Sequence, residues 1–405
     1  MDFLPFEGKK AIISNNHPRV NYMFKRLLHI DKNHPKSFFL FGPRGTGKTS
    51  WVRMQFPEAL YIDLLKNQDY MLLQNNPSRL EKLVLAHNSP WTVIDEVQKI
   101  PELLDEVHRL IETHKKYFVL TGSSSRKLKQ KGVNLLAGRA LTYHMHPLTC
   151  FEMGAAFNIK DALRYGLLPS IHTEQDPRAF LESYITTYLR EEVLQEGLVR
   201  HAGSFTRFME IASFSQGSQL NLANIAREVG VSRKIVETYF DILSDLLIAD
   251  QIPCFTKRAQ RKLSQHPKFY YFDVGVYKQL RPKGFLDSPE EIGGIAFETL
   301  FYQHIKACIH YYKLDLTLYF WRTATGVEVD FIIYGENGLF AFELKSRSSF
   351  STKDLSGLRA FKKDYPTANC YLIYTGEHTE KYDDVWVLPV EQALMRLPEL
   401  LLDDI

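Results

Sequence analysis

At 405 residues the chain is too long for one hydrophobic core, so its length predicts two or three domains. Hydrophobic residues make up 45% of the chain, as in a folded globular protein, and the formal net charge is only +3. A charge this small excludes a cationic field over the whole molecule, so any nucleic-acid site must be a local patch. The four cysteines are widely separated, which excludes a zinc motif or a disulfide scaffold and favours a reducing cytoplasm. The chain has neither a signal-peptide pattern nor an apolar run of about 18 residues, so we expect a cytoplasmic protein without membrane association.

Residues 1–150 have the pattern of an α/β domain. Between Ser37 and Met145, short strand-like runs alternate with segments that can form helices. This alternation predicts a parallel sheet with crossover helices. One of these helices follows Pro101, where apolar residues recur at helical spacing after an acidic first turn.

A glycine-rich loop, GPRGTGKT, lies between the apolar run SFFLF and a segment that can begin a helix. It matches the phosphate-binding pattern G-x-x-x-x-G-K-[ST], in which glycines let backbone N–H groups turn toward phosphates. We expect Lys48 to reach the β and γ phosphates of ATP and the Thr49 hydroxyl to bind Mg²⁺. The predicted nucleotide-binding residues are Gly42, Pro43, Arg44, Gly45, Thr46, Gly47, Lys48, Thr49 and Ser50.

Polar residues at the ends of two later strands complete the expected site. Asp95 and Glu96 close the run TVIDE; Asp95 is expected to hold Mg²⁺, and Glu96 to orient or polarise the attacking water. Ser123 follows the run YFVLTG and would sense the γ phosphate if its strand lies between the other two. An ordinary serine-rich turn is the alternative for Ser123.

The order GPRGTGKT, VIDEVQKIP, LTGSSS, LAGRA and MHPLTCFE resembles the ATPase core of a large family of bacterial and archaeal AAA+-type P-loop ATPases. The second half of these proteins is a domain of unknown function, and the resemblance spans essentially the whole chain. It implies that Arg139 reaches into the site of a neighbouring subunit, so that hydrolysis depends on a homo-oligomer. A helix C-terminal cation is the alternative for Arg139. Arg164 is a candidate second-sensor arginine.

The middle of the chain is mostly helical. We expect a helical lid or linker over residues 151–205 and a winged-helix-like module over residues 206–270. In the module, Gly230 ends one helix and Ser232 caps the next, which Arg233 and Lys234 open where a recognition helix would meet DNA. A helical pair used for packing or protein contacts is the alternative.

Residues 271–405 resemble the PD-(D/E)xK nuclease fold, with the proline of the motif replaced by Val329. Glu298 falls on a helix, while Asp330, Glu343 and Lys345 fall on two strands joined by the turn GENG. On this reading Asp330 and Glu343 share a second divalent metal, Lys345 positions or activates water, and Glu298 completes the site. For Asp273 a turn-capping role is expected.

Two functions from different classes follow. The first is an ATP hydrolase whose cycle controls a DNA-directed, nucleolytic C-terminal module. The second is an ATP-dependent switch that binds DNA or protein through the winged helix and keeps an inactive nuclease-like scaffold.

Overall fold

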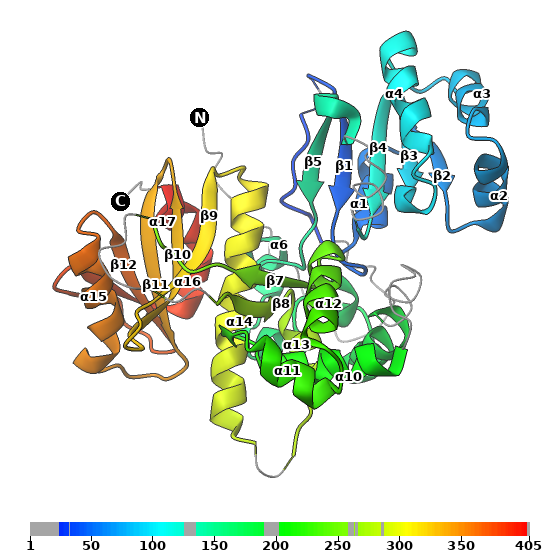
Figure 1. The fold of residues 1–405 in the computed structure, drawn as a ribbon. Coiled ribbons are helices and arrows are strands. Elements are labelled where there is room, and N and C mark those ends of the chain that lie inside the picture. Colours follow the sequence, from blue (N-terminus) through cyan, green and yellow to red (C-terminus); the bar gives the residue numbers. More distant parts are fainter. Residues whose placement is uncertain are drawn as a thin grey trace.

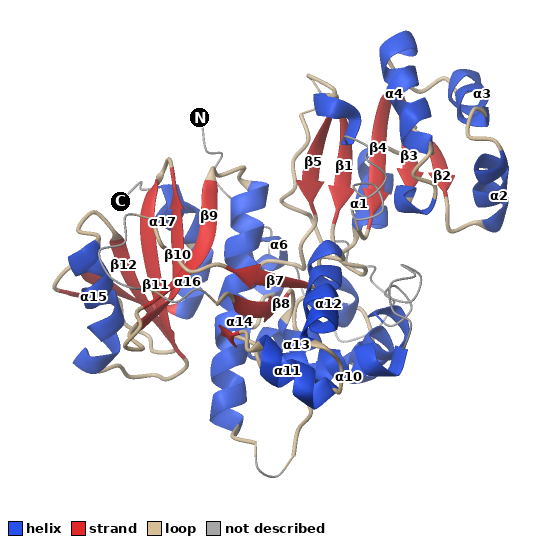
Figure 2. Cartoon of the chain, viewed as in Figure 1, coloured by secondary structure: helices blue, strands red, loops and turns tan. Residues whose placement is uncertain are grey.

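The computed structural model describes residues 24–31, 33–124, 135–189, 202–257, 263, 266–284 and 287–402. Across these residues it is an α/β structure with three sheets (Figures 1 and 2). No helix in the described ranges is long and apolar enough to cross a membrane.

The N-terminal sheet is parallel throughout, as the sequence predicted, with strand order β2-β3-β4-β1-β5. Strand β4 lies between β1 and β3, so the ends of these three strands meet at one edge of the sheet. The elements are β1 (Ser37–Phe41), α1 (Lys48–Gln55), β2 (Leu60–Asp63), α2 (Asn67–Asn75), α3 (Arg79–Ala86), β3 (Trp91–Asp95), α4 (Leu103–His114), β4 (Tyr117–Gly122) and β5 (Ala140–His144).

The middle region is helical around a small antiparallel sheet of order β6-β8-β7. Ser232 caps α12 through the backbone N–H of Ile235, and Gly230 ends α11 in a left-handed conformation, both as predicted. The described elements are α6 (Cys150–Met153), α7 (Ile159–Tyr165), α8 (Pro177–Ser183), a π-helical segment (Tyr184–Leu189), α10 (Ala202–Ser213), β6 (Ser218–Gln219), α11 (Leu222–Val229), α12 (Arg233–Asp245), β7 (Ala249–Ile252), β8 (Lys268–Tyr271) and α13 (Val274–Leu280).

The C-terminal sheet is mixed, with strand order β13-β14-β12-β11-β10-β9. Strands β9, β10 and β11 form an antiparallel meander. Strand β12 then runs parallel to β11, and β14 runs parallel to β12. A register shift between Val329 and Ile332 places a bulge at Asp330 and Phe331. The elements are α14 (Pro289–Tyr311), β9 (Leu316–Arg322), β10 (Glu328–Gly335), β11 (Gly338–Lys345), α15 (Ser356–Asp364), β12 (Asn369–Tyr374), β13 (Glu380–Tyr382), β14 (Val385–Pro389), α16 (Val390–Met395) and α17 (Leu397–Leu402).

Helix α14 connects the three regions. Its 23 residues give it a length of about 35 Å, and Figure 1 shows it standing between the N-terminal and C-terminal sheets. Near its C-terminus, Ala307 and Tyr311 belong to the core beneath β1 and α1. Further toward its N-terminus, Phe301 and Tyr302 belong to a second core shared by the middle and C-terminal regions. The helix is therefore buried against all three parts of the chain.

Asp273, for which a turn-capping role was expected, is the N-cap of helix α13 and also holds a distant loop. Its carboxylate accepts hydrogen bonds from the N–H groups of Gly275 and Val276 and, at 2.8 Å, from that of Leu167. Complete burial raises its pKa to about 6, although the three backbone donors oppose this shift. Because the site is buried, solvent could not hydrogen-bond to these three N–H groups if the carboxylate were removed.

We therefore expect Asp273→Ala to destabilise the protein by about 2–4 kcal/mol, because it removes a helix cap and leaves buried N–H groups unsatisfied. Asp176→Ala is a matched control, since Asp176 caps α8 through two N–H groups at an exposed position. That change should cost about 1 kcal/mol. Thermal unfolding followed by circular dichroism compares the two; equal losses would contradict the anchoring role of Asp273.

Candidate functional site

The loop Gly42–Thr49 joins the end of β1 to the start of α1. Gly45 and Gly47 have φ angles of 81° and 89°, a left-handed conformation that favours glycine. Helix α1 begins at Lys48, so its N-terminal N–H groups open onto the loop. This arrangement is suited to binding phosphate.

Lys48 is buried within the loop. Its ammonium donates to the backbone oxygens of Gly42 at 2.6 Å and Pro43 at 3.1 Å. The Thr46 hydroxyl also donates to Pro43, at 2.8 Å. The loop thus curls around its own lysine, which places the cation where the predicted phosphates would bind.

Asp95, at the end of β3, accepts hydrogen bonds from three hydroxyl groups. Thr49 donates to it at 3.0 Å, and Tyr61 and Thr121 donate to its two oxygens. Burial and the Asp95 carboxylate raise the pKa of Tyr61, so this phenol stays protonated and donates. The Thr49 hydroxyl and the Asp95 carboxylate are the oxygen ligands that a P-loop offers to Mg²⁺, so the residues present fit a magnesium–nucleotide complex.

Glu96 and Ser123 are brought together by a residue that the sequence did not single out. The side-chain amide of Gln98 donates to Glu96 at 2.5 Å and to Ser123 at 3.2 Å. Glu96 itself has a left-handed backbone, with φ 61°. Ser123 follows β4, which lies between β1 and β3, the position on which its predicted sensor role depended. Gln98 lies in VIDEVQKIP, but the motif ends at Glu96 and gave no reason to choose it.

Arg26 is a second contributor that sequence reasoning missed. Its guanidinium is buried and forms an ion pair with Glu152 at 2.8 Å. It also donates to the backbone oxygens of Thr46, at 2.5 Å, and His146, at 2.6 Å, and to the Tyr311 hydroxyl at 2.9 Å. Burial alone would lower the pKa of Arg26, but Tyr311 and Glu152 raise it, so the group is charged. One cation therefore joins the nucleotide loop to helix α14.

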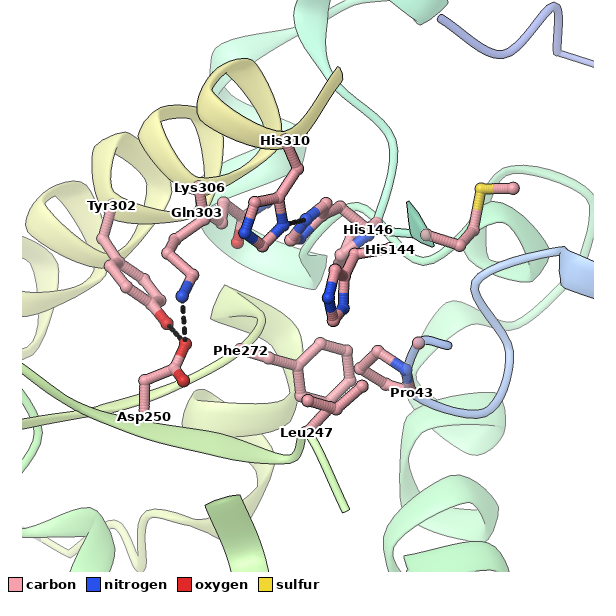
Figure 3. Close-up of a pocket in the computed structure, with 13 residues that line it drawn as sticks. Pro43, His144, His146, Leu247, Asp250, Phe272, Tyr302, Gln303, Lys306 and His310 are labelled. Carbon is pink, nitrogen blue, oxygen red and sulfur yellow. Dashed lines mark hydrogen bonds and ion pairs between the residues drawn. The ribbon is translucent and has the colours of Figure 1, made fainter. Parts of the chain in front are cut away.

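A pocket of about 240 Å³ lies behind the nucleotide loop, where Gly42 and Pro43 face α14. Figure 3 shows His144 and His146 from the end of β5 beside His310 from α14. His146 Nε2 and His310 Nδ1 are 2.7 Å apart. Burial lowers the pKa of His310 to about 3 and that of His146 well below its usual value, so both rings are neutral at neutral pH.

The two remaining arginine candidates lie elsewhere. Arg139 immediately precedes β5, so it lies where the parallel strands begin, whereas the nucleotide loop lies where β1 ends. At the surface it pairs with Glu112 of α4. Arg164 lies on α7, over the ring of Tyr165. Tyr184, a middle-region residue that the sequence did not single out, contacts the loop: its hydroxyl donates to the Arg44 carbonyl at 2.8 Å.

In the C-terminal region the structure brings the four candidate residues to one site. The Lys345 ammonium donates to Glu343 at 2.6 Å, and Asp330 accepts from the Leu344 N–H at 2.9 Å. Burial, together with Asp330, raises the pKa of Glu343 to about 8, and burial raises that of Glu298 to about 7. The second Glu343 oxygen is buried without a hydrogen-bond partner among the described residues.

Lys268 completes this cluster and was not predicted from the sequence. It lies on β8, is 2% exposed, and its ammonium contacts three carboxylates. These are Glu328 at 2.5 Å, Glu298 at 3.2 Å and Asp330 at 3.4 Å. Within the described ranges, no three His, Cys, Asp or Glu side chains are arranged to hold a metal ion.

Comparisons with known families divide the chain into three parts. Residues 34–154 match an AAA domain, residues 157–286 a domain of unknown function (DUF8612), and residues 293–393 another domain of unknown function (DUF4143). The uncharacterized protein Rv2008c of Mycobacterium tuberculosis is 26% identical over 88% of this chain and 80% of its own length. An uncharacterized protein of Haemophilus influenzae is 20% identical over 96% of this chain and 100% of its own length.

Likeness to solved structures is weak. The Walker-type ATPase PABY2304 of Pyrococcus abyssi is 13% identical, covering 62% of this chain and 92% of its own, with a TM-score of 0.41. Protein VC1899 of Vibrio cholerae is 9% identical, covering 90% of this chain and 97% of its own, with a TM-score of 0.23. Neither carries a fold assignment. The AAA-domain match and the geometry around Gly42–Thr49 instead support an ATP-binding P-loop ATPase domain at residues 34–154.

Proposed function

We propose that the protein is a Mg²⁺-dependent ATP hydrolase that acts as a nucleotide-controlled switch. The contacts of Asp95, Glu96 and Lys48 support the roles expected of them. Lys48 neutralises the β and γ phosphates, Thr49 and Asp95 hold Mg²⁺, and Glu96 orients the attacking water. Mg²⁺ held by Thr49 and Asp95 would offset charge on the transferred phosphoryl group. Gln98 keeps Glu96 beside Ser123, so a change at the γ phosphate reaches both residues.

Arg139 acts in trans in this proposal. It lies at the end of the sheet away from its own nucleotide loop, which supports a role in a neighbouring subunit of a homo-oligomer. The exposed pair with Glu112 is weak enough to be exchanged for a phosphate contact.

The observation that carries the switch is the double contact of Arg26, to Thr46 in the nucleotide loop and to Tyr311 on α14. Movement of the loop on nucleotide binding changes the position of a cation that helix α14 also holds. A row of side chains next to Tyr311 on α14 consists of Glu298, Tyr302, Lys306 and His310, spaced four residues apart. These side chains extend from the pocket behind the loop to the C-terminal carboxylate cluster.

The bound nucleotide controls whether the middle and C-terminal regions bind DNA or protein. The order α10, β6, α11, α12, β7, β8 supports a winged-helix-like module. Arg233 and Lys234 lie exposed at the start of α12, where a recognition helix meets DNA. The convergence of Glu298, Asp330, Glu343 and Lys345 on a meander favours a nucleolytic module as the second candidate function. The ion pairs that Lys268 forms with Asp330 and Glu298 favour an inactive nuclease-like scaffold.

Glu96→Gln should leave ATP binding intact and lower the rate of hydrolysis by about 10²–10⁴-fold, because the amide cannot accept a proton from water. Binding is measured by calorimetry and turnover by phosphate release. Lys48→Ala is the control that should lose ATP binding itself. Unchanged turnover in Glu96→Gln would remove Glu96 from the catalytic role.

Nuclease assays on several substrates decide between binding of DNA or protein alone and cleavage of nucleic acid. Full-length protein is incubated with ATP, Mg²⁺ or Mn²⁺, and single- and double-stranded DNA and RNA. We expect the same products from the wild type, Asp330→Ala and Lys345→Ala, because the carboxylates are already neutralised by lysine. Cleavage that either substitution abolishes would establish the nucleolytic function and refute the scaffold.

A further inference from the structure

The C-terminal carboxylate cluster contains its own cation. Three acidic side chains, Glu298 from α14 and Glu328 and Asp330 from β10, surround the Lys268 ammonium. An ammonium has three N–H donors, which is enough for one toward each of these three carboxylates. Three negatively charged partners thus surround a single cation.

Three carboxylate oxygens around the ammonium are engaged by donors as well. One Asp330 oxygen faces Lys268, while the other accepts from the Leu344 N–H at 2.9 Å. The Glu298 oxygen that faces Lys268 also accepts from the Tyr270 hydroxyl. A divalent metal would need several of these oxygens at about 2.1 Å in near-octahedral geometry, in the space that the ammonium fills.

Lys268 is also fixed in place by its strand. Strand β8 is buried along its whole length and pairs with both β6 and β7. Two residues beyond Lys268, the Tyr270 ring stacks on Tyr302 of α14, with ring centroids 4.7 Å apart. Withdrawing the ammonium would break this core and take from Glu298 and Asp330 their ion-pair partner, which is costly in a buried site, whereas Glu328 would keep its pair with Arg322.

We propose that Lys268 is the resident cation of this site and that its ammonium occupies the position of a divalent metal and excludes it. The middle region thus supplies, through β8, the charge that a metal supplies in the nuclease-like arrangement. The residues present do not fit a bound Mg²⁺ or Mn²⁺ while Lys268 remains. This inference concerns metal binding alone and is independent of ATP hydrolysis, so its failure would leave the ATPase proposal standing.

Iron-directed cleavage locates a metal site within the chain. Full-length protein without nucleotide is incubated with Fe²⁺ and ascorbate, and backbone cuts are mapped by mass spectrometry. We expect no cuts in β10 or β11 of the wild type or of Lys268→Arg, which keeps the positive charge. Lys268→Met should gain cuts near Asp330, and these should disappear in Lys268→Met/Asp330→Asn. Cuts in β10 or β11 of the wild type would overturn the proposal, as would a folded Lys268→Met without cuts.

A second measurement does not depend on a Lys268 variant folding. Mn²⁺ binding to wild type and to Asp330→Asn is counted by electron paramagnetic resonance, again without nucleotide. The two proteins should bind the same number of ions, because Asp330 holds none in the wild type. Loss of an ion in Asp330→Asn would overturn the proposal.

Discussion

The buried ion pair between Arg26 and Glu152 is the interaction on which the arrangement of the domains depends. Both side chains are almost fully excluded from water, so neither charge can be left without the other. Glu152 is held by its own capping box at α6, and Arg26 uses its remaining donors on the nucleotide loop, on the backbone after β5 and on Tyr311. A single planar cation with donors in several directions can make all these contacts, whereas a lysine could not. The Arg26 guanidinium therefore contacts both the nucleotide loop and helix α14 of the C-terminal half.

Helix α14 extends this connection across the molecule. Tyr311 meets Arg26 near one end, and Glu298 meets Lys268 about 20 Å further along the helix. Between them, Tyr302 and Lys306 both contact Asp250 of β7, and Tyr302 stacks on Tyr270, whose hydroxyl donates to Glu298. Polar and aromatic contacts therefore follow the helix from the nucleotide loop to the carboxylate cluster. In the proposed switch, the ion pairs of Lys268 hold the C-terminal carboxylate cluster in one arrangement, and the nucleotide loop is the part that changes conformation.

Much of the nucleotide domain could be predicted because its signals are local. The loop Gly42–Thr49, the strand before it and the helix after Pro101 follow from glycine conformation, apolar alternation and helical spacing. The helical pattern of VETYFDILSDLLIAD predicts a helix that continues to Asp250, but the helix ends at Asp245, because Ala249 and Asp250 pair with β8. Lys268, Arg26 and Gln98 could not be found in this way. Each acts through partners that are distant in sequence or outside a motif, and a lone lysine in PKFYYF has no pattern that distinguishes it from a solvated one.

In the proposed switch, nucleotide binding reaches helix α14 through the Arg26–Tyr311 contact. The most direct measurement is backbone hydrogen exchange across α14, with and without a slowly hydrolysed ATP analogue, in wild type and Tyr311→Phe. The neighbouring, partly exposed Tyr312 provides the matched control Tyr312→Phe. Nucleotide should slow exchange in α14 of the wild type and of Tyr312→Phe, and this protection should be lost in Tyr311→Phe although the analogue still binds. Equal protection in all three proteins, or none in the wild type, would contradict transmission through this contact.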